Sequence, residues 1–291
     1  MFGAYIIGDE LLVGKREDKH LGFVIGALAR RGLRLAWAQY LGDDPERLTE
    51  ALRRSFASRD IVFSFGGIGA TPDDHTRECA AAARGVPLEL HPDAEREIRA
   101  RFAGGDATPQ RLQMGEFPRG ASIIPNPVNR IPGFSIADHH FVPGFPQMAW
   151  PMVEWLLETR YRDHFDRQRW AEASIYVYEA GESQLIAAMQ TVEREFKGLK
   201  VFSLPSMGAD GSRIHVELGV RGDPAEVAPA MEKPGMRLTG LGMIAAPCGN
   251  SPICKRCGVT SCPGKRARIS RSASGCSSSG TSRAAAAHCR G

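Results

Sequence analysis

The sequence predicts an α/β fold: a three-layer α/β/α domain with a mostly parallel sheet, followed by a small α+β domain. Strand-like and helix-like segments alternate over residues 1–90, as in a parallel sheet covered by helices on both faces. The rhythm then changes, and the periodicity fades towards the end of the chain. We expect three parts: a domain at 1–165, a domain at 170–232, and a low-complexity tail at 233–291 that is disordered or out of frame.

Apolar periodicity and turn residues place the elements of the first domain. A short apolar strand ends at Gly8-Asp9, and the next helix begins after Asp18 and stops near Gly32. Pro45 occupies a tolerated first-turn position of the following helix. The expected elements are, in order, strand 5–7, helix 18–32, strand 33–40, helix 45–56 and strand 60–65.

Residues 108–146 are rich in Pro and Gly, so short strands and tight turns are expected there and helices are not. A helix over 146–161 closes the first domain. Its expected buried stripe is Met148, Met152, Trp155 and Leu156. The second domain is expected to contain strand 173–178, helix 182–196, strands 200–204 and 213–220, and helix 224–231.

Charge and cysteine content separate the end of the chain from the rest. The formal charge is +4, but residues 248–291 contain eight Lys and Arg and no acidic residue, so the preceding part carries −4. Only Cys79 precedes that segment, which is typical of a reduced, cytoplasmic protein. No apolar run reaches the length of a membrane span, so we expect neither export nor insertion.

The strand at 60–65 runs into a glycine-rich turn at 66–69, and an alanine-rich helix follows up to Gly85. We expect Thr71 to cap this helix, with Pro72 at its first position and Asp74 at its third. The glycines allow the backbone to approach a phosphate, which the helix N-terminus attracts. A tight turn without a ligand explains the glycines equally well from spacing alone.

The position of the turn favours a ligand, because ligands of open α/β sheets collect beyond the carboxyl ends of the strands. A second acidic pair, Asp9-Glu10, follows the first strand and is expected at the same edge as Asp73-Asp74. Two loops with carboxylates at one sheet edge predict a phosphate ligand held together with a divalent metal such as Mg²⁺.

Five motifs in order give the chain a resemblance to the MoaB/Mog and CinA N-terminal family. They are Gly8-Asp9-Glu10-Leu11-Leu12-Val13-Gly14-Lys15, Gly42-Asp43-Asp44-Pro45, the segment from Gly66 to Thr76, Ile124-Pro125-Asn126-Pro127-Val128 with Pro132-Gly133-Phe134, and Val142-Pro143-Gly144-Phe145-Pro146-Gln147-Met148. The resemblance implies a MoaB/Mog-like three-layer fold that binds molybdopterin or a nucleotide, a homo-oligomer, and a KH-like second domain. Activities in such relatives include adenylyl transfer to molybdopterin and metal-dependent cleavage of ADP-ribose or FAD-like pyrophosphates.

Carried onto this sequence, the resemblance implies catalytic roles for Asp9, Asp73 and Asp74, with Asp9 and Asp73 as metal ligands. The expected ligand contacts are Gly8, Glu10, Gly66, Gly67, Gly69, Thr71, Asn126, Pro143 and Gly144. Three positions depart from the family pattern: Phe65 replaces a common Thr, Ala70 replaces a common Pro, and His20 lies where an Asn is common.

The other candidate residues favour structural roles. His75 is expected to be solvated, and His139 and His140 point to opposite faces of a strand, so one metal cannot easily use both. Cys79 is expected in the core. For Lys15 and Arg130 the sequence fits two roles equally well, contact with phosphate oxygens or a solvated surface position. Cys254-x-x-Cys257, with Cys248 and Cys262, has zinc-like spacing, but the apolar residues that would support the ligands are lacking.

The leading hypothesis is metal-assisted hydrolysis of a dinucleotide pyrophosphate. The alternative is a binding module for a phosphorylated pterin that does not turn over, or a Mog-type protein of molybdenum cofactor synthesis. Nucleic acid is not an expected partner, because the second domain shows no Gly-x-x-Gly loop in its helical approach and the basic charge lies in the tail.

Overall fold

The structure is a computed structural model, and it describes residues 1–105, 107–165, 171–178, 181–207, 214–233, 236 and 245–248. The chain divides into two compact units, Met1–Trp170 and Ala171–Gly291, which are described separately.

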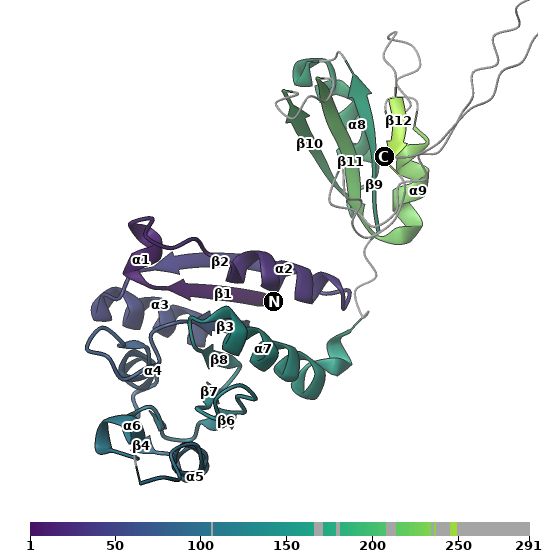
Figure 1. The fold of residues 1–291 in the computed structure, drawn as a ribbon. Coiled ribbons are helices and arrows are strands. Elements are labelled where there is room, and N and C mark those ends of the chain that lie inside the picture. The colour runs from purple at the N-terminus through teal and green to yellow at the C-terminus, as the bar shows by residue number, and fades with distance from the viewer. Residues whose placement is uncertain are drawn as a thin grey trace, which may run out of the picture. The chain divides into compact units, whose positions relative to one another are not determined.

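The first unit alternates strands and helices before it enters a region of short strands (Figure 1). Its elements are β1 Phe2–Ile7, α1 Asp9–Leu12, α2 His20–Ala29, β2 Leu35–Leu41, α3 Pro45–Ala57, β3 Ile61–Phe65, α4 Thr76–Arg84, β4 Leu88–Leu90, α5 Pro92–Arg101, α6 Pro109–Gln113, β5 Glu116–Pro118, β6 Ser122–Ile124, β7 Gly133–Ile136, β8 His139–Val142 and α7 Pro146–Arg160.

The main sheet has the strand order β2-β1-β3-β8-β7-β6. The pairs β2–β1, β1–β3 and β3–β8 are parallel, and β8–β7 and β7–β6 are antiparallel. The expectation of a mostly parallel sheet is confirmed. From β1 the chain continues to β2 on one side and then to β3 on the other side of β1. The direction in which strands are added to the sheet therefore reverses between β1 and β3, and ligands of such sheets bind at this point.

Two separate cores confirm the three layers. Ile6 of β1 packs with Val24 of α2 and Met152 of α7 on one face of the sheet. Ile7, the next residue along β1, packs with Leu52 of α3 on the other face, because side chains alternate along a strand. Burial of each such aliphatic side chain contributes roughly 1.5–3 kcal/mol, so both helical layers are held to the sheet by apolar contact.

Two local expectations for this unit are wrong. The Pro/Gly-rich segment contains a short helix, α6, whose first turn accepts Pro109 after Thr108 caps it. The buried side of α7 is also rotated from the expected one: Met152 and Leu156 are buried, but Trp155 is 36% exposed and Met148 is half-buried.

The second unit contains β9 Ala171–Tyr178, α8 Ile186–Glu195, β10 Lys200–Ser206, β11 His215–Gly222, α9 Pro224–Met231 and β12 Ala245–Cys248. Its sheet order is β10-β11-β9-β12, with every pair antiparallel. This is the split βαβ arrangement of a βαββαβ unit, in which the third strand enters between the first two. The KH-like interpretation is therefore not confirmed.

The second unit continues past the expected boundary at 232. Met236 is fully buried in its core, and β12 adds an edge strand to β9. The rest of the predicted tail, with the zinc-like Cys254 and Cys257, lies outside the described residues.

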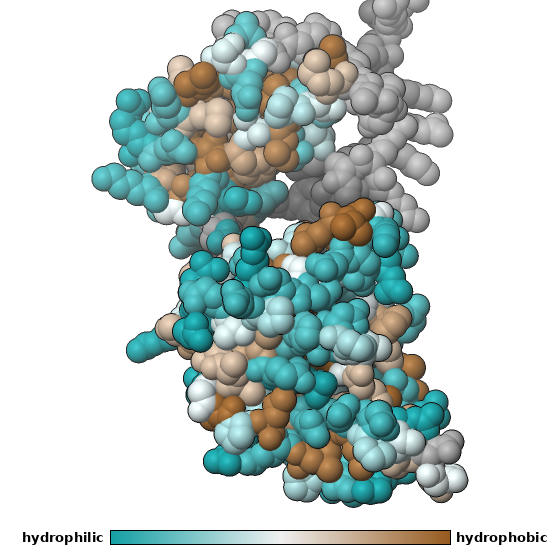
Figure 2. All heavy atoms as spheres, turned by 90° about the vertical axis from the view of Figure 1, so that its left-hand side faces the viewer, coloured by the Kyte–Doolittle hydropathy of each residue, from teal (hydrophilic) through white to brown (hydrophobic). Residues whose placement is uncertain are grey.

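The face of the first unit in Figure 2 is largely hydrophilic, with apolar side chains exposed in small groups. Within the part of the chain that the structure describes, no helix is long and apolar enough to cross a membrane.

Candidate ligand-binding cleft

A cleft of about 750 Å³ lies beyond the carboxyl ends of β1, β3 and β8. The parallel register brings these ends together, because Ile6 pairs with Phe65 and Phe65 pairs with Val142. Of the ligand contacts expected from the sequence, the structure places all nine on the wall of the cleft, namely Gly8, Glu10, Gly66, Gly67, Gly69, Thr71, Asn126, Pro143 and Gly144.

The glycine turn after β3 folds back onto the start of α4. Gly66 has φ +105°, and a Cβ there would lie 2.4 Å from the carbonyl oxygen of Ile7. Gly67 has φ +66°, and its Cβ would lie 2.3 Å from Oγ1 of Thr76. The hydroxyl of Thr76 donates to the Gly66 carbonyl at 3.1 Å, and its N–H donates to the Gly67 carbonyl at 2.9 Å. Contacts within the protein thus already require glycine at both positions.

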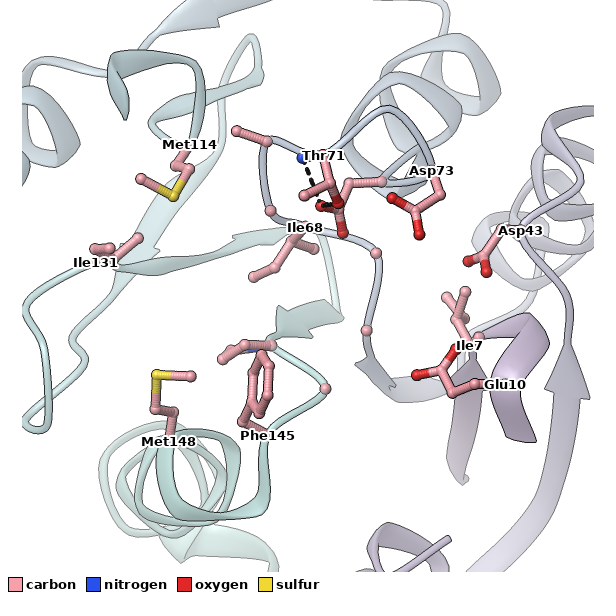
Figure 3. Close-up of a pocket in the computed structure, with 18 of the residues that line it drawn as sticks. Ile7, Glu10, Asp43, Ile68, Thr71, Asp73, Met114, Ile131, Phe145 and Met148 are labelled. Carbon is pink, nitrogen blue, oxygen red and sulfur yellow. Dashed lines mark hydrogen bonds between the residues drawn. The ribbon is translucent and has the colours of Figure 1, made fainter. Parts of the chain in front are cut away.

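The expected helix cap at Thr71 is wrong, since α4 begins at Thr76 with His75 preceding it and no side chain capping it. Instead Thr71 and Asp74 close a turn of their own. The Thr71 N–H donates to Asp74 Oδ2 at 2.9 Å, its hydroxyl donates to the same oxygen, and the Asp74 N–H donates to the Thr71 carbonyl at 3.0 Å. The Asp74 carboxylate therefore holds the loop in shape, while Asp73 projects from the same turn (Figure 3).

Besides Asp74, which Thr71 engages, three carboxylates gather on one side of the cleft, from Glu10, Asp43 and Asp73 (Figure 3). Burial raises the pKa of Asp43, and the negative charges of Asp9, Glu10 and Asp73 raise it further. This side of the cleft therefore carries an excess of negative charge that a cation would relieve.

Asp9 supports this side from outside the cleft. Its N–H donates to Asp43 Oδ2 at 2.9 Å, and its Oδ1 accepts the Asp43 N–H at 3.2 Å. Its side chain is exposed and is not part of the cleft wall. Among the described residues, no three His, Cys, Asp or Glu side chains lie close enough to hold a metal ion without further ligands. The role of Asp9 and Asp73 as metal ligands stays a prediction.

The opposite side of the cleft is apolar. Met114, Ile131 and Met148 face the glycine turn across the opening, with Ile68 and Phe145 between them and the carboxylates (Figure 3). These residues and Asp43 are not among the site residues expected from the sequence. Asp43 could have been found from its motif, but the apolar residues come from separate segments without a common pattern.

Asn126 shapes the cleft wall through its own hydrogen bonds. It is 6% exposed, its Nδ2 donates to the Ile131 carbonyl at 2.9 Å, and its Oδ1 accepts the Val128 N–H at 3.0 Å. Both bonds hold the loop that presents Ile131 to the cleft.

The basic side chains lie in two different places. Lys15 and Arg16 line the cleft. Arg130 lies in a different groove, where its guanidinium pairs with Glu97 at 2.9 Å.

Cys79 is buried in the core, as expected, and the two strand histidines point to opposite faces of β8. His139 Nε2 lies 2.8 Å from Ser55 Oγ, whereas His140 bonds to Ser135 and Tyr161. The two side chains thus follow the alternation expected along a strand. His75 is half-buried at the start of α4.

Residues 3–163 match a family whose description is "Probable molybdopterin binding domain", and the match covers the whole cleft. The chain belongs to this family. Among its relatives in the molybdopterin-binding-domain family, a CinA-like protein from Anaeromyxobacter sp. strain Fw109-5 is 38% identical over 157 residues, which are 52% of this chain and 38% of that protein. A CinA-like protein from Desulfovibrio desulfuricans is 30% identical over 234 residues, 78% of this chain and 53% of that protein.

A solved structure resembles the family domain directly. It is that of the protein CinA, of unknown function, from Thermoplasma acidophilum, with 27% identity and a TM-score of 0.50 over 54% of this chain and 96% of that one. This chain spans only 38% and 53% of the two curated relatives named above.

Proposed function

We propose that this chain hydrolyses a dinucleotide pyrophosphate with the help of Mg²⁺. The observation that carries the proposal is the division of the cleft into two sides: the carboxylates of Glu10, Asp43 and Asp73 beside the glycine turn, and an apolar side across from them. Phosphates with a cation suit the first side, and a flat ring of a base suits the second. A volume of about 750 Å³ is that of a small-molecule site.

The donor set fits a cation that arrives with its phosphates. Mg²⁺ is usually held by one or two carboxylates together with substrate phosphate oxygens, so a cluster of three protein ligands is not required. Asp73 would hold the ion together with Glu10, which lines the cleft where the predicted ligand Asp9 does not, and the ion would supply charge stabilisation at phosphorus and a more acidic water. Burial is the first cause of the raised pKa of Asp43, and the nearby negative charges of Asp9, Glu10 and Asp73 raise it further, which supports a cation beside these carboxylates.

Proton transfer and stabilisation of the leaving group are then carried out by protein side chains. Asp43 accepts a proton from the attacking water at Oδ1, since its Oδ2 already accepts the Asp9 N–H. The raised pKa of Asp43 favours this proton uptake. The water oxygen bonds to phosphorus, the bond from phosphorus to the bridging oxygen breaks, and the leaving phosphate keeps that electron pair. Lys15 and Arg16 line the cleft and stabilise the charge on this leaving phosphate.

The test incubates the purified chain with ADP-ribose, FAD, NAD and molybdopterin, with Mg²⁺ or with a chelator, and follows both binding and cleavage. We expect Asp43→Asn and Asp73→Asn to lower kcat at least about 100-fold. Asp44→Asn is the matched control, because Asp44 caps α3 through the Arg47 N–H at 2.8 Å and asparagine caps equally well. Full activity in both Asp43→Asn and Asp73→Asn would contradict the mechanism.

A non-catalytic pterin-binding module is the second candidate. It is favoured by one observation, that no three metal-binding side chains of the described residues converge before a ligand is present. Saturable molybdopterin binding without cleavage of any of the other three compounds would establish this alternative.

A further inference from the structure

One amide side chain contacts two of the three residues that form the apolar side of the cleft. Asn129 lines the cleft from the loop between β6 and β7, and it is half-buried. Its Oδ1 accepts the Ile131 N–H at 3.0 Å. Its Nδ2 donates to Met148 Sδ at 3.0 Å, in the first turn of α7. Asn129 therefore joins this loop to α7 behind the surface that Ile131 and Met148 present to the cleft (Figure 3).

The same loop contains a residue in an unfavourable backbone conformation. Arg130, between Asn129 and Ile131, has φ +63°, in the left-handed region that residues other than glycine seldom adopt. Its guanidinium pairs with Glu97 in a different groove, and an exposed ion pair of this kind contributes little to stability. Such a conformation persists only where the surrounding structure holds it, and it is frequent beside ligand sites.

Two asparagine amides hold the backbone around Arg130. The Arg130 N–H donates to the Asn126 carbonyl at 3.0 Å, and Asn126 Nδ2 donates to the Ile131 carbonyl at 2.9 Å. The Ile131 carbonyl is thus fixed by Asn126, and the Ile131 N–H is fixed by Asn129. Loss of the Asn129 amide would free the N–H of Ile131 and the sulfur of Met148 together, while the bonds of Asn126 keep the loop closed.

The rest of the cleft is held by other bonds. Met114, the third apolar residue, follows a residue whose carbonyl accepts a hydrogen bond from the Arg77 guanidinium at 2.5 Å. The carboxylate side depends on the turn that Thr71 and Asp74 close. A change at Asn129 should therefore alter the apolar side and leave the phosphate side intact.

We infer that Asn129 is a positioning residue that makes the cleft select ligands with a planar ring beside their phosphates. It acts through Ile131 and Met148, which it fixes in place for contact with the ring, and a thioether packs well against an aromatic ring. Order imposed before binding raises affinity, because the ligand does not have to immobilise these side chains. The inference rests on the proposed function, which assigns the ring to the apolar side.

The test compares ADP with inorganic pyrophosphate, which carries the same two phosphates without a ring. Their affinities are measured by calorimetry with Mg²⁺ in an Asp43→Asn background that slows cleavage. We expect Asn129→Ala to weaken ADP binding at least about tenfold and to leave pyrophosphate binding within about twofold. Arg130→Ala is the matched control, because it changes the next residue of the loop, keeps a Cβ at φ +63° and removes only the ion pair with Glu97. It should leave both affinities within about twofold.

Two further variants separate the two bonds of Asn129. Asn129→Ser keeps a short acceptor for the Ile131 N–H but does not reach the Met148 sulfur, so the loss of ADP affinity should be only about threefold. Met148→Leu keeps an apolar side chain without the sulfur acceptor. In that background Asn129→Ala should cost less than about fivefold in ADP affinity, because one of its two bonds is already absent.

The inference and the proposed function fail in different ways. If both compounds bind and Asn129→Ala leaves the ratio of their affinities unchanged, Asn129 does not control selection of the ring, and the proposed function stands. If neither compound binds the unmodified chain, both fail. A loss confined to ADP, in a chain that cleaves neither ADP-ribose nor FAD, would support this inference and remove the hydrolytic function. Thermal melting of each variant, followed by tryptophan fluorescence, confirms that the first unit is folded.

Discussion

Two buried histidines on β8 should make the first unit sensitive to mild acid. His139 is 1% exposed and His140 is fully buried. Burial, with a smaller effect from the Arg84 charge, lowers the pKa of His139 to about 4. Burial, with a smaller effect from Arg160, lowers that of His140 to about 3. Because both values lie below the unfolded value of about 6.5, the stability they contribute is complete above pH 6.5 and is lost as the pH falls.

The size of the loss follows from proton uptake by the unfolded chain. At pH 5 each imidazole is almost fully protonated in the unfolded state and almost unprotonated in the folded state. Roughly 1.5 pH units at about 1.4 kcal/mol per unit give about 2 kcal/mol for each histidine and about 4 kcal/mol for the pair. Domains are stable by only about 5–15 kcal/mol, so this change is large.

Urea titrations at pH 5, 6, 7 and 8 measure this dependence. The four tryptophans all precede residue 171, so their fluorescence follows the first unit. His139→Gln and His140→Gln should each reduce the difference in unfolding free energy between pH 7 and pH 5 by about 2 kcal/mol, whatever they cost at pH 7. His75→Gln is the control, because His75 is only half-buried, at the start of α4.

The decisive quantity is the pH dependence and not the absolute stability. An unfolding free energy that changes by less than about 1 kcal/mol between pH 7 and pH 5 in the unmodified chain would refute the assignment of both buried, neutral histidines.

Three further predictions concern the cleft and the end of the chain. Gly67→Ala should lower the unfolding free energy by about 2 kcal/mol or more in urea titrations, because of its φ of +66° and the 2.3 Å approach to Thr76; unchanged stability would contradict this. Ala70→Glu places a charge on an exposed part of the cleft wall and should weaken phosphate-ligand binding at least about tenfold in calorimetry without changing the melting temperature. Removal of residues 249–291 should leave the melting temperature measured by circular dichroism unchanged. Removal of 245–291 also deletes β12 and should lower the melting temperature of the second unit. Equal melting temperatures of the two truncated proteins would show that β12 contributes nothing to stability.

Local pattern was enough for much of the first unit. The short apolar run before Gly8 predicted β1, and helical spacing with Pro45 predicted α3, because neighbours along the chain determine which face of an element is apolar. The order of the motifs also predicted the cleft at the ends of β1 and β3, since parallel strands present their carboxyl ends at one edge.

The tertiary structure decided what depends on contacts between distant segments. Thr71 does not cap α4, because its bonds to Asp74 close a separate turn and Thr76 bonds back to the glycines instead. Asp43 replaces Asp9 on the cleft wall, because the backbone N–H of each residue donates to the carboxylate of the other across 34 residues.

The apolar side of the cleft was also not predictable from the sequence. Met114, Ile131 and Met148 share no spacing, and only the folded structure brings the end of α6, the loop before β7 and the first turn of α7 together at one sheet edge. Periodicity is a property of neighbours along the chain, whereas a binding site is a property of neighbours in space.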